Sequence, residues 1–254
     1  MVHADTSALV IGGTQGLGLA IAERLKAEGC TRIVISGRDA AKGRAAAEAL
    51  GAIYLPADLA DTDSIIRLVD EAAGRLGRIT ALVNAGAATD RGSILDTSPA
   101  LWDRIMAVNV RSPFFAIQRV AERAIAAGYP ASVVNILSMV VHCGQTFLAP
   151  YSASKAALAN VTRNAAHTLR HRRIRVNGIN CGWMDTPGED AIQRRFHGAG
   201  DDWLEKAEAR QPFGMLVKPG HVAGLAAYML GPASGVMTGA VVDFDQNVAG
   251  AYPE

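Results

Sequence analysis

Short apolar runs alternate with longer amphipathic segments along almost the whole chain. The runs are rich in Val, Ile and Leu, and the first, fourth and fifth show little polar alternation, as strands buried on both faces do. They span residues 8–11, 32–36, 52–55, 81–83, 132–137, 175–179 and 240–244. Helical periodicity is found between them, for example over residues 18–28, 61–76, 100–127 and 151–171. This order predicts a doubly wound α/β fold, with a mostly parallel Rossmann-type sheet and helices on both faces.

The chain shows no sign of a second domain. No linker rich in Pro, Gly or Ser divides it and no segment repeats at a fixed period, so we expect one domain over residues 1–254. Residues 183–213 break the strand–helix order and carry the aromatic side chains Trp183, Phe196 and Trp203. So many aromatic residues would be unusual in a structureless surface loop. We interpret this segment as a mobile helical lid over a pocket, with simple packing against the domain as an open alternative.

Charge and composition argue against several classes of protein. The 25 Lys and Arg residues nearly balance the 24 Asp and Glu residues, which argues against binding to nucleic acid or to an anionic membrane surface. No apolar run reaches the roughly 18 residues of a membrane span, and the first residues do not read as a secretory signal. The cysteines, Cys30, Cys143 and Cys181, follow no metal-ligand pattern. We therefore expect a cytoplasmic protein with free thiols and no bound metal.

The first predicted strand runs directly into a glycine-rich turn that precedes a helix. The turn reads Gly12, Gly13, Thr14, Gln15, Gly16, Leu17 and Gly18. Glycine permits a sharp turn and a close approach of phosphate to the backbone, and the helix N-terminus offers free N–H groups. The spacing differs from the standard Gly-x-Gly-x-x-Gly of dinucleotide sites. We interpret the turn as a pyrophosphate site for a nicotinamide dinucleotide, and the alternative is a tight turn without a ligand.

The end of the second strand carries the signal for the choice of dinucleotide. NAD-specific sites place a carboxylate there for the ribose 2′-hydroxyl, whereas NADP sites use Arg for the 2′-phosphate. Here Gly37 stands where the acid is expected, and Arg38 follows. The sequence therefore favours NADP(H) modestly over NAD(H). The alternative is that Arg38 is a solvated loop cation.

The candidate catalytic residues lie further along the chain. Tyr151 and Lys155 are four residues apart at the start of a predicted helix, so their side chains share one face. Ser138 ends the strand predicted over residues 132–137, and ligands of doubly wound folds gather at the carboxyl ends of strands. A phenol is a poor base at neutral pH, because its ordinary pKa is about 10. We expect a nearby ammonium, together with the positive nicotinamide ring, to lower that pKa.

With these motifs the chain resembles the short-chain dehydrogenases/reductases in their single-domain form. The resemblance covers residues 8–244 and rests on five elements in the right order and spacing. They are the Gly-x-x-x-Gly-x-Gly turn, Asn84-Ala85-Gly86, Asn109, Ser138 and the Tyr-x-x-x-Lys of Tyr151 and Lys155.

The resemblance implies a role for each catalytic residue. Tyr151 would be the general acid and base at the carbinol oxygen, and Lys155 would lower its pKa and hold the nicotinamide ribose. Ser138 would orient the substrate oxygen, and Asn109 would hold a water that links Lys155 to solvent. Further contacts to the dinucleotide would come from Asp58, Leu59, Asn84, Ala85, Gly86, Gly182, Met184 and Thr186.

The chain departs from the family pattern at three places. Ile11 replaces the usual Thr before the first motif glycine, and Cys181 replaces the usual Pro before Gly182. Asp245-Gln246-Asn247 stands where a pair of glycines is more usual. Neither the Ile11 nor the Cys181 departure removes a catalytic group.

The resulting hypothesis is an oxidoreductase that moves a hydride between NAD(P)(H) and a secondary alcohol or ketone. His142, Gln145 and Trp183 are candidate substrate contacts, and a polar pocket with aromatic walls suits a sugar or polyol. Apolar surface on more than one side of the segments 100–127 and 151–171 suggests a homo-oligomer, as in the tetramers common in this family. The alternatives are a silent dinucleotide sensor on the same fold, or an isomerase or dehydratase without net redox.

Overall fold

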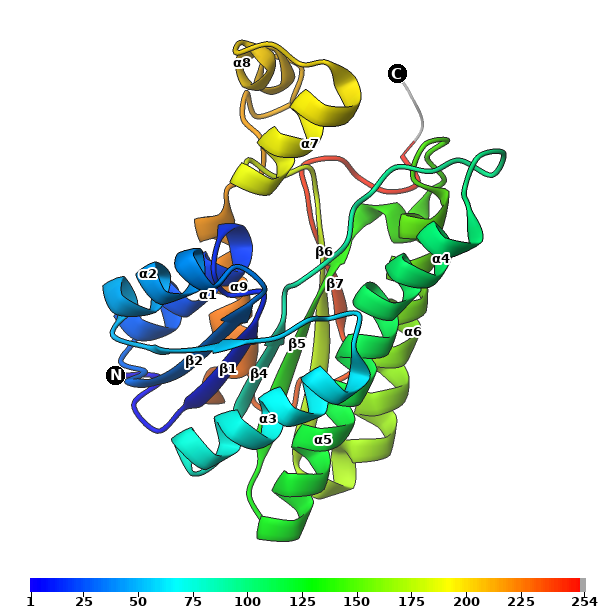
Figure 1. Cartoon of the computed structure of the whole chain (residues 1–254). Helices are drawn as coiled ribbons and strands as arrows, with labels where there is room; N and C mark the ends of the chain where they lie inside the picture. Colours follow the sequence, from blue (N-terminus) through cyan, green and yellow to red (C-terminus); the bar gives the residue numbers. More distant parts are fainter. Residues whose placement is uncertain (252–254) are drawn as a thin grey trace.

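All seven predicted strands form, and they join into one parallel sheet (Figure 1). The computed structural model describes residues 1–251. The strand order is β3-β2-β1-β4-β5-β6-β7, and every neighbouring pair is parallel. The strands are β1 (Ser7–Ile11), β2 (Arg32–Gly37), β3 (Ile53–Pro56), β4 (Ala81–Asn84), β5 (Ala131–Ser138), β6 (Ile174–Cys181) and β7 (Val241–Phe244). The prediction of a single doubly wound α/β domain is confirmed.

Helices cover both faces of the sheet, because side chains alternate between the faces along each strand. Val10 and Ile35 pack with α1 (Gly16–Ala27), α2 (Ala40–Leu50) and α9 (Pro219–Leu230). Leu9 and Val34 face the other way, into a second core. That core is formed with α3 (Thr62–Leu76), α5 (Ser112–Ala127) and α6 (Ala149–Leu169). Among residues 1–251 we find no helix with both the length and the apolar character needed to cross a membrane.

The helix predicted over residues 100–127 contains an interruption. It consists of α4 (Pro99–Met106), a π-helical turn η1 (Ala107–Arg111) and α5. Pro113 has no N–H group, so it cannot donate the α-helical hydrogen bond to the carbonyl of Asn109. The helix widens at this point, which places Asn109 in the π turn. Short 3₁₀ turns complete the fold at η2 (Met139–His142), η3 (Arg170–Arg172) and η4 (Pro232–Ser234).

The strand order reverses direction at β1, which lies between β2 and β4. The connections that leave the carboxyl ends of β1 and β4 therefore run to opposite sides of the sheet. In doubly wound folds a crevice opens at such a switch point, and ligands bind there. The glycine turn follows β1 and Asn84-Ala85-Gly86 follows β4, so both predicted motifs border this place.

Residues 183–213 are partly helical and lie beyond the carboxyl ends of the strands (Figure 1). They contain α7 (Pro187–His197) and α8 (Trp203–Glu208), which we call the α7–α8 segment. Each indole donates to an acid of α7: Trp183 to Glu189 at 2.8 Å and Trp203 to Asp190 at 2.7 Å. The two indoles lie 6.3 Å apart between ring centres, so the aromatic residues hold this segment together. Its role as a mobile lid stays a prediction.

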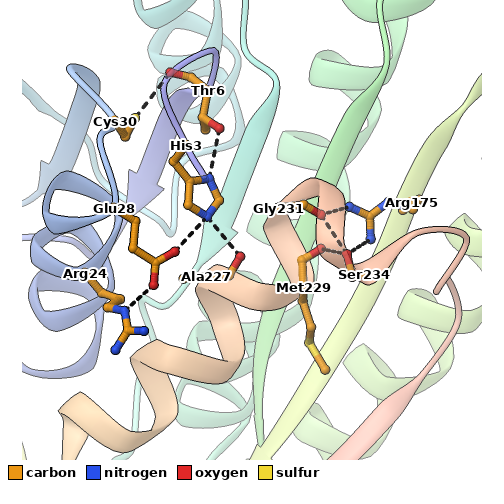
Figure 2. A network of polar contacts seen from close by, with 10 residues as sticks. All are labelled: His3, Thr6, Arg24, Glu28, Cys30, Arg175, Ala227, Met229, Gly231 and Ser234. Atoms are coloured by element: carbon orange, nitrogen blue, oxygen red, sulfur yellow. Dashed lines mark hydrogen bonds and ion pairs between the residues drawn. The ribbon is translucent and has the colours of Figure 1, made fainter. Parts of the chain in front are cut away.

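The N-terminal residues are attached to the last long helix through a buried histidine (Figure 2). Nε2 of His3 lies 3.1 Å from the carbonyl oxygen of Ala227 in α9, and Nδ1 lies 2.9 Å from the hydroxyl of Thr6. A carbonyl oxygen only accepts, so Nε2 carries a proton, and the Thr6 hydroxyl can donate to Nδ1 of a neutral imidazole. Burial lowers the pKa of His3 below its ordinary value, although the nearby carboxylate of Glu28 opposes the shift.

Candidate active site

Ser138, Tyr151 and Lys155 come together at the carboxyl end of β5. Ser138 is the last residue of that strand, and Tyr151 lies in the first turn of α6. Lys155 follows one turn later, and its Nζ is 5.6 Å from the centre of the Tyr151 ring. The same Nζ donates a 2.8 Å hydrogen bond to the carbonyl oxygen of Ile136. Strand β5 therefore holds both the hydroxyl and the ammonium beside the phenol.

Burial dominates the electrostatics of these groups. It raises the pKa of the Tyr151 phenol, while the Ser138 hydroxyl and the charge of Arg91 act in the opposite direction. Burial also lowers the pKa of Lys155 to about 8, so most of the ammonium stays charged at pH 7. The thiol of Cys181 lies close to Lys155, and burial raises its pKa to about 12. Cys181 is therefore a neutral thiol near neutral pH, which leaves Lys155 as a buried cation beside the phenol.

Asn109 connects the loop after β4 to α6. Its amide accepts from the N–H of Ala88 at 2.7 Å and donates to the carbonyl of Ala88 and to Ser154 Oγ, both at 2.9 Å. Ser154 in turn donates to the carbonyl oxygen of Tyr151 at 2.7 Å. The side chain of Asn109 thus positions the turn that carries the phenol, and the water link to Lys155 stays a prediction.

The glycine turn and the loop after β4 lie against each other. Gly12 has φ +80°, and a Cβ at this position would lie 2.4 Å from the backbone nitrogen of Gly86. A Cβ at Gly18 would lie 2.1 Å from the carbonyl oxygen of Gly12. The first turn of α1 has no side-chain cap, so its N–H groups are not satisfied in that way. Such a bare backbone cradle fits the pyrophosphate of a dinucleotide.

The end of β2 contains no acid that could bind a ribose 2′-hydroxyl. A Cβ at Gly37 would lie 2.7 Å from Oγ1 of Thr14, so the threonine occupies that space. Asp39 is engaged as the N-cap of α2 and accepts from the N–H groups of Ala41 and Lys42. Arg38 is exposed, and within residues 1–251 it makes no ion pair or side-chain hydrogen bond. This end of the crevice therefore offers a cation without a competing partner.

The remaining predicted cofactor residues border the same crevice or lie near it. Asn84 is buried; its Nδ2 donates to Asn135 at 2.8 Å, and its Oδ1 has no partner among the described residues. Thr186 caps α7 through a 3.1 Å hydrogen bond from the N–H of Glu189. Asp58 is exposed and accepts from the N–H of Ala60 at 3.0 Å. The orphaned Asn84 oxygen and the bare glycine turn both fit a bound NAD(P), while Leu59, Ala85, Gly86 and Met184 are half-buried along these loops.

The unusual Asp245 lies directly against Gly182. A Cβ at Gly182 would lie 2.1 Å from an Asp245 carboxylate oxygen, so that carboxylate fills the space beside the glycine. The backbone N–H of Gly182 donates to Phe244 at 3.0 Å, which extends the β6–β7 pairing. Across residues 1–251, no three His, Cys, Asp or Glu side chains gather closely enough to hold a metal ion.

The predicted substrate residues lie around this site but have different surroundings. Asp243 joins His142 to the end of β6: its Oδ1 lies 2.9 Å from His142 Nε2 and accepts from Asn180 at 2.7 Å. Trp183 is half exposed and donates to Glu189, and Gln145 is exposed.

The sequence analysis missed two charged residues of this site. The charges of Arg91 and Glu189 both act on the pKa of Tyr151, and the bridge from Gly92 to Leu148 brings the loop of Arg91 to the start of α6. Arg91 follows the Asn84-Ala85-Gly86 motif in the loop after β4. Its position at the carboxyl end of a strand next to β5 was the available signal.

The chain is similar to known oxidoreductases over almost its whole length. A family profile described as "Enoyl-(Acyl carrier protein) reductase" matches residues 12–247. The cis-4-hydroxycyclohexanecarboxylate dehydrogenase of Sinomonas cyclohexanicum is 34% identical over 249 residues, which cover 95% of this chain and 96% of the relative. The sorbitol dehydrogenase of Cereibacter sphaeroides is 31% identical, covering 89% of this chain and 90% of the relative.

Solved structures show the same fold. A variant of actinorhodin polyketide ketoreductase, determined with NADPH, superposes with a TM-score of 0.88 at 27% identity. The match covers 99% of this chain and 100% of that chain. Together with the geometry of Ser138, Tyr151 and Lys155, these similarities show that the chain belongs to the short-chain dehydrogenase/reductase family of NAD(P)-dependent oxidoreductases.

Proposed function

We propose that this enzyme interconverts a polar secondary alcohol, of the sugar or polyol kind, and the corresponding ketone, with NADP(H) as its preferred cofactor. The observation that carries this proposal is the convergence of Ser138, Tyr151 and Lys155 at the same edge of the parallel sheet as the glycine turn. The relatives described above are named for a hydroxycyclohexane carboxylate and for sorbitol, so polar alcohols are represented among them.

In the proposed reaction, Tyr151 moves the proton of the substrate oxygen. In the oxidation direction the phenolate takes the hydroxyl proton, and in the reduction direction the phenol returns a proton to the carbonyl oxygen. When bound, the nicotinamide accepts or supplies the hydride at the carbinol carbon. Ser138 hydrogen-bonds the same substrate oxygen, and the Lys155 ammonium stabilises the phenolate. Because burial raises the pKa of Tyr151, the phenol is protonated at neutral pH before substrate binds, which suits ketone reduction.

The test of this mechanism removes only the phenolic oxygen. We expect Tyr151→Phe to lower kcat by about 10²- to 10⁴-fold, the usual contribution of a general acid or base. The affinity for NADP(H), measured by fluorescence of the reduced nicotinamide, should stay close to that of the wild type. Turnover is measured with a panel of sugars, polyols and ketones, in both directions.

The matched control is Tyr228→Phe on α9, where the tyrosine is 48% exposed. This variant should keep its activity. If Tyr151→Phe keeps most of the wild-type turnover, the proposed proton transfer is rejected. If the wild type binds the dinucleotide tightly but turns over no alcohol or ketone, the proposed reaction is rejected.

The preference for NADP(H) rests on Arg38 and on the absence of an acid at position 37. We expect Arg38→Gln to weaken NADP(H) binding by about 10- to 100-fold, because a hydrogen bond to a charged group contributes about 1.5–3 kcal/mol. NAD(H) has no 2′-phosphate, so its affinity should change little. Arg75→Gln, on the exposed end of α3, is the control. Wild-type protein that binds NAD(H) more tightly than NADP(H) would overturn the preference.

A further inference from the structure

Arg91 is held at a fixed place relative to the phenol by backbone hydrogen bonds. The next residue, Gly92, accepts from the N–H of Ala149 and donates to the carbonyl of Phe147, both at 3.0 Å. This isolated parallel bridge joins the loop after β4 to the start of α6, and Tyr151 lies only two residues beyond Ala149. The side chain of Arg91 therefore cannot move away from the phenol without breaking the bridge or changing its own rotamer.

The partners of the Arg91 guanidinium are all uncharged groups. Nε and Nη2 lie 3.3 and 3.2 Å from Nε2 of His197, which accepts as a neutral imidazole. Nη1 donates to the carbonyl of Thr89 at 3.3 Å, and the guanidinium lies over the Phe147 ring, 5.3 Å from its centre. Within residues 1–251 no carboxylate comes within the 4.0 Å of an ion pair. Of the five N–H groups of an arginine, one on each terminal nitrogen is then left for a ligand.

The acids closest to Arg91 are occupied elsewhere. Asp90 is shared by Arg104 at 3.7 Å and Arg195 at 4.0 Å. Oε1 of Glu189 accepts from Trp183 and from Gln193, at 2.8 and 2.7 Å. The guanidinium is half-buried, and burial lowers the pKa of Arg91 while Glu189 and Tyr151 raise it. A partly desolvated cation without an anionic partner is costly, and an incoming anion removes that cost.

We propose that Arg91 binds a carboxylate of the substrate, so that the polar alcohol of the proposed function is a hydroxy acid, or in the reverse direction a keto acid. Two parallel N–H groups match the two oxygens of a carboxylate. Glu189 lies close enough to act on Arg91, and its charge opposes a second negative charge on the ligand. A carboxylate with one charge therefore fits better than a phosphate with two. This inference rests on the proposed function for the position of the carbinol at Tyr151.

The test compares substrates that differ only in charge. The probes are 3-hydroxybutanoate, 4-hydroxypentanoate and 5-hydroxyhexanoate with their primary amides, in which the carboxylate is replaced by a neutral group of similar shape. For the best acid of the series, we expect kcat/KM to exceed that of its amide by about 10- to 100-fold, the size of a charge-assisted bidentate contact. Arg91→Gln should remove this selectivity by lowering kcat/KM for the acid alone, and Arg91→Lys should retain part of it.

A control variant and a binding measurement make the result independent of folding and turnover. Arg67→Gln removes an exposed cation of α3, away from this site, and should preserve the selectivity. Butanoate, pentanoate and hexanoate, and their amides, are titrated into the enzyme–NADP(H) complex, where the wild type should bind an acid more tightly than its amide. Equal turnover and equal binding of acids and amides by the wild type would overturn the carboxylate site, as would equal loss of both in a folded Arg91→Gln. Tight binding of the acids without turnover of any alcohol would leave Arg91 supported and reject the proposed function instead.

Discussion

Gly12 lies at the closest contact between the two motifs that border the dinucleotide crevice. Its φ of +80° belongs to the left-handed region, and the position of a Cβ there is already occupied by the backbone of Gly86. Gly74 on α3 differs in both respects, because a Cβ at that position would meet nothing within 4 Å. Position 12 therefore requires glycine, whereas position 74 does not.

Substituting alanine at the two positions should have opposite effects on stability. Gly12→Ala should lower the free energy of unfolding by about 1–3 kcal/mol from backbone strain alone, with a further cost from the contact with Gly86. Gly74→Ala should raise it by about 0.5–1 kcal/mol, because alanine is the better helix former. Thermal unfolding of both variants beside the wild type measures this. A Gly12→Ala protein as stable as the wild type would show that the turn is not as tight as described.

The residues of the candidate site differ in how far the sequence could predict them. Tyr151 and Lys155 are detectable because one helical turn separates them, and Ser138 because it ends a strand. Arg91 has no such local signature. Its place beside the phenol depends on the bridge between Gly92 and Leu148, which joins two loops far apart in the sequence. Contacts of this kind are properties of the folded chain.

Among the elements, the strands were the most predictable. Buried parallel strands are continuous apolar runs, so β5 was expected over 132–137 and is found over Ala131–Ser138. The helix expected over 100–127 hides a π turn, which the apolar periodicity does not reveal, although Pro113 marks it. The structure of the α7–α8 segment was harder to predict, because it depends on the indole hydrogen bonds to Glu189 and Asp190. These pairs join residues that have no periodic relation in the sequence.

At the scale of the whole molecule, His3 joins the N-terminal residues to α9, across the α1 side of the sheet (Figure 2). Because burial lowers its pKa, the unfolded chain binds a proton on this histidine at a higher pH than the folded chain does. Folding stability attributable to His3 is therefore present above about pH 6.5, the ordinary histidine value, and declines as the pH falls below it. For one such proton, the free energy of unfolding changes by at most about 1.4 kcal/mol per pH unit.

This linkage predicts a specific pH dependence of stability. Between pH 7.5 and pH 5.5, the unfolding midpoint of the wild type should fall more than that of His3→Gln, which lacks the titrating group. The control is His167→Gln, an exposed histidine on α6 whose removal should leave the pH response of the wild type unchanged. Parallel pH responses in the wild type and His3→Gln would contradict the assignment of a neutral buried imidazole.

The short bridge between Gly92 and Leu148 limits the distance between the two groups that we propose to contact the substrate. It joins the backbone beside the proposed anion-binding residue, Arg91, to the backbone before the proposed proton-transferring residue, Tyr151, so the span between the two side chains changes only with their rotamers. Chain length then becomes a criterion of selection: a hydroxy acid one methylene too short or too long would place its carbinol out of reach. The enzyme would then select substrates by the length of the chain between carbinol and carboxylate, as well as by their charge.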